Sequence, residues 1–436
     1  MIKTSFLTSK PFAVSSILVG ILLLFNINVM GLESGSQYCH PDTDVVVRVG
    51  ADRLFEEYSC LIDGRRVALV SNHTGRLSDG QHLADVLYNY EKAELKVLFG
   101  MGYNIRTNDY SLPKDDEMSF DPETGVVKYS LYDDIHKPTP EMLKEVDVII
   151  FDIQEVGARF YEHINILGFV MEAAAENNIE IVVLDRPNPI TGLKMDGFVT
   201  DNEFLYGFGA FAKVPVLHGL TMGELAKLYN GEGMLRGGVR ANLKVIKMKG
   251  WQRSMWFDQT GLTWEKPSPN LPSLESMLVY TGTCLFEGLN ISTGRGTEMP
   301  FQYIGAPWID NERVVKLLND LKLDGVAFDT ITFSPRKMPF HSQNPYLTGE
   351  ICKGIYISVS ERDLFEPYKA GIALLWAIHK LHSDNLKFSM DTLDRLVGTR
   401  RLVSMIRSGS HPFEIFASWD EELTIFKEVS KKYLIY

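Results

Sequence analysis

Cysteine is scarce in this 436-residue sequence, which holds four in all and no pair of them in the CxxC spacing. An HExxH segment is also missing, and no histidines and cysteines cluster closely, so nothing indicates a zinc site. The chain lacks a GxxxxGK(S/T) phosphate loop, and no GxGxxG follows the first expected strand, which argues against a dinucleotide site. We therefore expect no cofactor.

Positive charge is in the minority, since 44 Lys and Arg face 56 Asp and Glu and give a formal net charge of -12. A nucleic-acid partner is not expected, because binding to phosphates needs a basic surface. The four cysteines, Cys39, Cys60, Cys284 and Cys352, allow up to two disulfides, and free thiols are the alternative.

Long apolar runs are confined to the N-terminus. Residues 11–25 are largely apolar and follow Lys3 and Lys10, with small residues near Gly31, as in a secretory signal. A signal anchor is the alternative, although the apolar core is short for a membrane span. We expect residues 1–31 to be a cleaved signal peptide, with no stable membrane insertion afterwards. The mature protein would be secreted, or periplasmic or lumenal.

Four short apolar runs in the first half of the chain each end in polar residues: RVALV, LKVLF, VDVIIF and IEIVVL. Such runs are typical of strands buried on both faces, and helical patterns lie between several of them. They predict an α/β fold with a Rossmann-like parallel sheet over residues 45–235. The glycine-rich stretch 231–238 marks a boundary, and the patterns beyond it predict a smaller C-terminal α/β subdomain over residues 236–436. The two parts would share a cleft.

Polar side chains follow these runs at the point where each expected strand ends. Since the carboxyl ends of parallel strands meet at one edge of a sheet, a ligand site is expected there. The residues concerned are Asn72 after the first run, Asp152, Gln154 and Glu155 after the third, and Arg186 and Asn188 after the fourth. Asp152 and Glu155, near Arg159 and Tyr161, could supply an acid or a base, or bind hydroxyl groups. The alternatives are an ion pair of Glu155 with Arg159, and local backbone bonds in a turn for Asn188.

Two later segments also offer candidates. His218 precedes an expected helix that Thr221 and Glu224 open with a capping box, and it is either a titrating group or a structural one. The run 287–298 is rich in glycine and polar groups, which suit a binding loop for sugar hydroxyls or a carboxylate, and a long turn is the alternative. The candidates in that run are Glu287, Asn290, Arg295 and Glu298. Of Trp251, Trp256 and Trp264, which precede Asn270, we expect at least two in a hydrophobic core.

Taken together, these motifs resemble one family, the exo-β-N-acetylmuramidases, formerly a domain of unknown function. The segments that carry the resemblance are VALVSNHTG, FDIQEVGARFY, MEAAAE, VLDRPNP, HGLTMGELA, TGLTW followed by PSPNLP, YTGTCLFEGLNISTGRGT, PFQYIGAP and KKYLIY, in this order. The resemblance implies a Rossmann-like domain and a smaller C-terminal subdomain with a cleft between them. It also implies removal of N-acetylmuramic acid from the non-reducing end of peptidoglycan fragments, without metal or nucleotide.

The chain departs from this family after the second core strand. The family typically has a Pro-Glu-His-Gly stretch there, and its glutamate is a leading candidate for catalysis. Here Met101, Gly102, Tyr103 and Asn104 stand in its place, while Arg106 just beyond is retained. Losing a general acid commonly lowers a rate by about a hundredfold to ten-thousandfold.

Three hypotheses follow. The first is a secreted hydrolase whose catalytic carboxylates are Asp152 and Glu155, assisted by Glu287 or Glu298, with Arg159, Arg186 or Arg295 binding the lactyl carboxylate of the sugar. All the substrate-binding candidates are Asn72, Arg106, Gln154, Arg159, Tyr161, Arg186, Asn188, His218, Asn270, Asn290 and Arg295. The second is a catalytically impaired relative that binds muramyl sugars or peptidoglycan fragments, which Gly102 favours. The third is a different small-molecule enzyme on the same fold.

Overall fold

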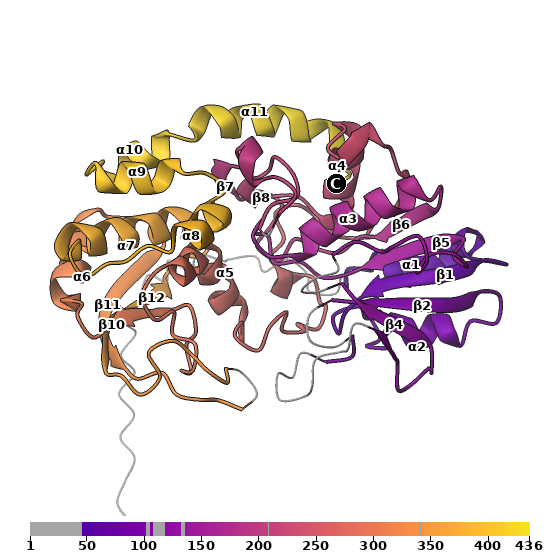
Figure 1. The fold of residues 1–436 in the computed structure, drawn as a ribbon, viewed down its shortest axis with the longest axis horizontal. Coiled ribbons are helices and arrows are strands. Elements are labelled where there is room, and N and C mark those ends of the chain that lie inside the picture. Colours follow the sequence, from indigo (N-terminus) through magenta and orange to yellow (C-terminus); the bar gives the residue numbers. More distant parts are fainter. Residues whose placement is uncertain (1–45, 102–104, 108–117, 132–135, 208, 340–341) are drawn as a thin grey trace, which may run out of the picture. The chain divides into compact units, whose positions relative to one another are not determined.

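The computed structural model describes residues 46–101, 105–107, 118–131, 136–207, 209–339 and 342–436 (Figure 1). The expected signal peptide, Cys39, and the departure at Gly102, Tyr103 and Asn104 lie outside these residues.

A seven-stranded sheet forms the larger part, in the order β3-β4-β2-β1-β5-β6-β9. Its strands are β1 (Arg66–Ser71), β2 (Glu94–Gly100), β3 (Met118–Phe120), β4 (Val127–Ser130), β5 (Val148–Asp152), β6 (Glu180–Leu184) and β9 (Asn242–Ile246). All neighbours from β4 to β9 run parallel, and β3 alone pairs antiparallel with β4. The prediction of a Rossmann-like parallel sheet is therefore confirmed.

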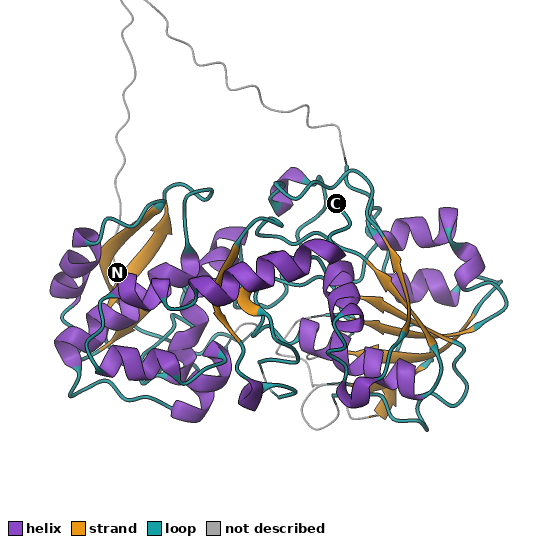
Figure 2. Ribbon diagram, turned by 90° about the horizontal axis from the view of Figure 1, so that it is seen from above, coloured by secondary structure: helices purple, strands orange, loops and turns teal. Residues whose placement is uncertain are grey.

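Helices cover both faces of this sheet, which explains why its central strands β1, β5 and β6 are buried along most of their length (Figure 2). Leu69 of β1 packs in one core with α1 (Gly50–Glu57) and α2 (Leu83–Tyr88). Val70, the next residue, packs in another core with α3 (His163–Glu176) and α4 (Met222–Gly231). The α4 helix begins with the predicted capping box, because Thr221 Oγ1 accepts from Glu224 N and Thr221 N donates to Glu224 Oε2.

The last strand of the larger sheet lies beyond residue 235, where we predict the end of the first domain. Strand β9 pairs in parallel with β6, with Ile181 opposite Leu243, so the larger sheet continues past residue 235. The glycine-rich stretch 231–238 is the connection from α4 to β9, in which Gly233, Gly237 and Gly238 adopt positive φ angles. Its glycines therefore allow the turns that lead from α4 into β9.

A smaller α/β part follows, as predicted. Its three-stranded antiparallel sheet has the order β10-β12-β11, made of β10 (Tyr303–Ala306), β11 (Val326–Phe333) and β12 (Cys352–Val359). The helices are α5 (Leu274–Thr283), α6 (Asn311–Asp320), α7 (Pro367–His382), α8 (Met390–Val397), α9 (Arg401–Arg407), α10 (Pro412–Ala417) and α11 (Asp420–Ser430). A two-stranded antiparallel pair, β7 (Met195–Val199) and β8 (Pro215–His218), lies against α11.

Two long-range ties join the smaller part to the larger one. Arg159 is fully buried, and its guanidinium donates to the carbonyls of Gly209, Leu396 and Val397, the last two at the C-terminal end of α8. The segment 431–436 returns to the larger part, where Tyr436 donates its hydroxyl to Asp185 Oδ2 at 2.7 Å and accepts from Met248 N.

The tryptophans and cysteines of the described residues are mostly interior. Trp251 and Trp256 are buried in two separate hydrophobic cores, and Trp264 packs against the core that contains Trp256. This confirms the prediction that at least two of these three tryptophans belong to a core. Cys60, Cys284 and Cys352 are free thiols. No helix in the described part of the chain combines the length and apolar character needed to cross a membrane.

Candidate active site

The polar strand ends lie together at one edge of the larger sheet. Ser71, the last residue of β1, pairs with Gly100 on one side and with Asp152 on the other, and β6 follows next to β5. The segments after β5 and β6 then enter the core of the smaller part, where Val156 and Ile190 pack with helices α5 and α7. This edge is therefore held between two cores.

A buried ion pair dominates this edge. Asp152 is 0% exposed, and its two carboxylate oxygens accept from Nε and Nη2 of Arg186 at 2.6 and 2.7 Å. Burial raises the pKa of Asp152, and the Arg186 guanidinium opposes that rise. Nη2 of Arg186 also donates to the carbonyl of Arg76 at 2.7 Å. Asp152 thus fixes Arg186, and Arg186 fixes the backbone after β1.

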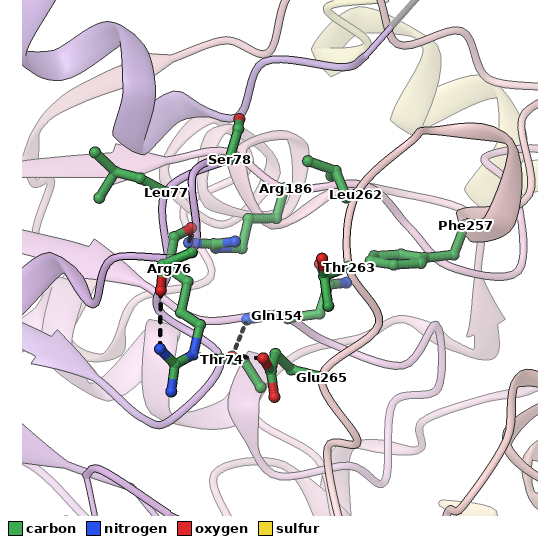
Figure 3. A pocket seen from close by; sticks show the side chains of 11 residues that line it. Thr74, Arg76, Leu77, Ser78, Gln154, Arg186, Phe257, Leu262, Thr263 and Glu265 are labelled. Atoms are coloured by element: carbon green, nitrogen blue, oxygen red, sulfur yellow. Dashed lines mark hydrogen bonds and ion pairs between the residues drawn. The ribbon is translucent and has the colours of Figure 1, made fainter. Parts of the chain in front are cut away.

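A polar pocket opens next to this ion pair (Figure 3). The pocket and the open solvent at its mouth together occupy about 550 Å³. The residues that line it are Thr74, Arg76, Leu77, Ser78 and Gly80 after β1, Gln154 and Arg186 from the other strand ends, and Phe257, Leu262, Thr263 and Glu265 from a later loop. Guanidinium, hydroxyl, amide and carboxylate groups in one hollow suit a ligand with hydroxyls and a carboxylate.

A hydrogen-bond network holds one wall of this pocket. Asn72 Oδ1 accepts from the amide and the hydroxyl of Thr74, and Thr74 Oγ1 in turn accepts from Gln154 N at 3.0 Å. His163 bonds the Gln154 carbonyl through Nδ1 at 2.9 Å and faces Asn72 Nδ2 through Nε2. Burial lowers the pKa of His163 to about 4, so its imidazole is neutral at pH 7. Asn72 and His163 therefore act as supports for Thr74 and Gln154.

The side chain of Glu155 is buried, and its partners are residues outside this wall. Its Oε2 accepts from the amide of Gly157 and lies 3.6 Å from Nε2 of His218, and both side chains are buried. Nδ1 of His218 accepts from Leu220 N, so a proton is assigned to Nε2, which faces Glu155. The partner of Glu155 is thus His218, whereas Arg159 binds carbonyl oxygens.

The other predicted residues lie outside the lining of this pocket. Asn188 is buried, and its side chain donates to Leu220 O and accepts from Ile190 N. The side chain of Asn290 donates to Asn385 O and accepts from Lys387 N. Tyr161 donates to Pro267 O near the buried Asn270, and Arg106 bonds Asp121 and Asp85. Arg295 pairs with Glu287 at 2.6 Å, and Glu298, with a side chain that is 79% exposed, borders a different hollow with Arg336. Their roles in catalysis or binding stay predictions.

Two charged pocket residues escaped the sequence analysis, Arg76 and Glu265. Arg76 comes two positions after Thr74, in the turn that follows β1. Considering more residues beyond the end of the strand could have identified it. Glu265 follows Trp264 in a loop with no strand signal of its own. Nε of Arg76 and Oε1 of Glu265 lie 3.5 Å apart.

A second hollow lies beside the pocket and shares Phe257 with it. It encloses about 850 Å³, open solvent included. Pro189 lines it from the segment after β6, and Leu274, Ser360 and Arg362 line it from the smaller part. A cleft with walls from both parts agrees with the expected architecture. The described residues contain no group of three or more His, Cys, Asp or Glu side chains placed to hold a metal ion.

Comparisons with known proteins agree with this architecture. The family models for the N-terminal and C-terminal domains of the exo-β-N-acetylmuramidase NamZ match residues 67–275 and 278–436. The chain is 40% identical over 391 residues to the peptidoglycan β-N-acetylmuramidase NamZ of Bacillus subtilis, covering 89% of this chain and 91% of that one. Two crystal structures of DUF1343 family proteins from Bacteroides fragilis are 33% and 32% identical, with TM-scores of 0.82 and 0.72. They cover 90% and 89% of this chain and 99% of their own.

Both halves of the match fall on parts that the structure contains. The N-terminal model spans the larger sheet from β1 to β9, and the C-terminal model spans the smaller part and the returning segment 431–436. The chain belongs to the family of the exo-β-N-acetylmuramidase NamZ.

Proposed function

We propose that this chain is an exo-acting glycoside hydrolase that releases N-acetylmuramic acid from the non-reducing end of peptidoglycan fragments. The observation that carries this function is the match of both halves to the NamZ family, with 40% identity to the Bacillus subtilis enzyme. The pocket at the strand ends supports it, because it is lined by the partly exposed guanidinium of Arg76, which suits a carboxylate, and by further polar residues, Thr74, Ser78 and Gln154. Residues 1–31 support export, and we propose a secreted, periplasmic or lumenal protein that works without a cofactor.

Hydrolysis of a glycoside usually needs two carboxyl groups, one as proton donor and one as nucleophile or base. Asp152 is buried, and both of its carboxylate oxygens are bonded to Arg186, which lines the pocket. Glu155 is committed to Gly157 and His218 in the interior. Glu265 is the carboxylate among the described residues that line the pocket.

A second candidate function is binding of muramyl sugars or peptidoglycan fragments by a catalytically impaired protein. Gly102 favours it, since the resembling family has a candidate catalytic glutamate at that point. The buried partners of Asp152 and Glu155 favour it too, because neither carboxylate is poised in the pocket.

Hydrolysis of a chromogenic β-N-acetylmuramide by the purified mature protein tests both functions. We expect release of the chromophore by the wild type and its loss in the Asp152→Asn variant, provided that circular dichroism shows this variant folded. Asp147→Asn is the matched control, because Asp147 forms a similar pair with Arg66 on the surface.

If no chromophore is released but calorimetry shows saturable binding of N-acetylmuramic acid, the second candidate function, binding without hydrolysis, would remain. In that case a Gly102→Glu, Tyr103→His variant should gain activity. Absence of both release and binding would contradict both functions.

A further inference from the structure

We propose that Arg76 binds the lactyl carboxylate of the muramic acid sugar and thereby sets the preference for this sugar over N-acetylglucosamine. The lactyl ether is the group that distinguishes the two sugars, and its carboxylate is their difference in charge. A guanidinium can bind a carboxylate through two parallel N–H groups, which gives direction as well as attraction. Because the carboxylate belongs to the proposed substrate, this assignment rests on the proposed function.

The three arginines expected from the sequence are committed elsewhere. Arg159 is fully buried and binds three carbonyl oxygens. Arg186 uses Nε and Nη2 for the two oxygens of Asp152. Arg295 is paired with Glu287 and is not among the residues that line the pocket.

Arg76 has the required edge available. Its Nη1 donates to the Gly80 carbonyl at 2.9 Å, which anchors one corner of the guanidinium. Its Nε is buried and makes no hydrogen bond to the described residues, and the 3.5 Å to Glu265 exceeds an ordinary hydrogen-bond length. The Nε and Nη2 groups share the edge that binds carboxylates side-on. An N–H left unpaired at the wall of a pocket is costly unless a ligand or water takes it up.

The backbone of Arg76 is held in place for this role. Its carbonyl accepts from Arg186 Nη2, and its amide donates to Thr74 O at 2.8 Å. The side chain of Arg76 is 35% exposed, so a ligand can reach it. In Figure 3, Arg76 and Glu265 approach each other from two sides of the pocket.

Glu265 competes with the substrate for this edge. Its carboxylate is the group that now faces Nε of Arg76, and its side chain is 40% exposed. A lactyl carboxylate would have to displace it, at the expense of a weak, half-exposed ion pair. Removing the charge of Glu265 should therefore strengthen binding of the muramic sugar, which is the opposite of what the loss of a catalytic or hydroxyl-binding carboxylate would do.

The test compares the Arg76→Gln and Glu265→Gln variants on chromogenic β-N-acetylmuramide and β-N-acetylglucosaminide. Calorimetry of the two free sugars replaces kinetics if turnover is absent. For Arg76→Gln we expect KM or Kd for the muramic sugar to rise about tenfold to a hundredfold, from the loss of charge-assisted hydrogen bonds, with kcat unchanged. Values for the glucosamine sugar should stay as in the wild type.

For Glu265→Gln we expect KM or Kd for the muramic sugar to fall by about twofold to fivefold. Arg336→Gln, an exposed arginine at another hollow, is the matched control.

Two outcomes would overturn the assignment of Arg76 while leaving the proposed function intact. One is a wild-type protein that prefers the muramic sugar together with an Arg76→Gln variant that keeps the same preference. The other is weaker binding of the muramic sugar by Glu265→Gln. A wild-type protein that neither hydrolyses nor binds the muramic sugar would overturn the proposed function, and this assignment with it.

Discussion

The ion pair of Asp152 with Arg186 should be far more important for stability than its surface counterpart. Both pairs have the same bidentate form, since Arg66 donates Nε and Nη2 to the two oxygens of Asp147. They differ in burial, because the side chain of Asp152 is 0% exposed and that of Asp147 is 36% exposed. Removing one partner of a buried pair leaves an uncompensated charge and costs about 3–5 kcal/mol. An exposed pair contributes about 0–1 kcal/mol.

The measurement is a double-mutant cycle by urea unfolding. Asp152→Leu and Arg186→Met should each lower the free energy of unfolding by about 3–5 kcal/mol. The double variant should recover about 2 kcal/mol or more of the summed loss, because neither charge is then left unpaired. The same cycle on Asp147 and Arg66 should show a coupling below about 1 kcal/mol. Equal coupling energies in the two cycles would refute the reasoning from burial.

Three further predictions concern stability. Gly398→Ala should lower the free energy of unfolding by about 1–3 kcal/mol, because Gly398 has φ +79 and an added Cβ would lie 2.8 Å from Arg159 Nη2; Gly409→Ala, with φ +82 and open space, should cost less in the same urea titration. Tyr436→Phe should lower the free energy of unfolding by about 1–3 kcal/mol, because Asp185 and the amide of Met248 each lose a hydrogen-bond partner. Tyr88→Phe, at an exposed tyrosine, should leave the free energy of unfolding unchanged. Burial lowers the pKa of His82 and of His163 to about 4, below the unfolded value near 6.5, so these two histidines favour the unfolded chain as the pH drops from about 6.5 to about 4. The buried carboxyls of Asp185 and Asp196, with pKa values raised to about 7 and about 6, act in the opposite direction, so the contribution of His82 is measured against the wild type. A His82→Gln variant should lose less stability over that range, and an unchanged slope would contradict the assignment.

The strand ends were predictable from the sequence because burial on both faces leaves a local signal. RVALV and VDVIIF are apolar apart from Arg66 and Asp147 near their starts, and the structure pairs them in parallel, with Ser71 opposite Asp152. The capping box of Thr221 and Glu224 was also predictable from a local pattern, because its two partners are three positions apart in the sequence. Local rules therefore recovered the elements and the edge of the sheet where the pocket lies.

Contacts between distant segments were not predictable in this way. The polar run DIQEVGAR places Glu155 and Arg159 close in sequence, but the fold gives Glu155 to His218 and gives Arg159 to the end of α8. Arg76 and Glu265 meet only because a late loop packs over the end of β1. A glycine-rich turn before β9 looked like a domain boundary, because pairing of β9 with β6 has no signature in the intervening chain.

The returning segment 431–436 has a consequence for the order of folding during synthesis. Tyr436 reaches Asp185 across 251 positions of the chain, and Arg159 reaches Val397 across 238. The strand ends of the larger sheet therefore acquire their last hydrogen-bond partners only when the final helices have left the ribosome. Until then this edge stays incompletely bonded, and closing such long loops slows folding. The larger sheet should thus reach its full set of hydrogen bonds only after both family domains have been synthesised.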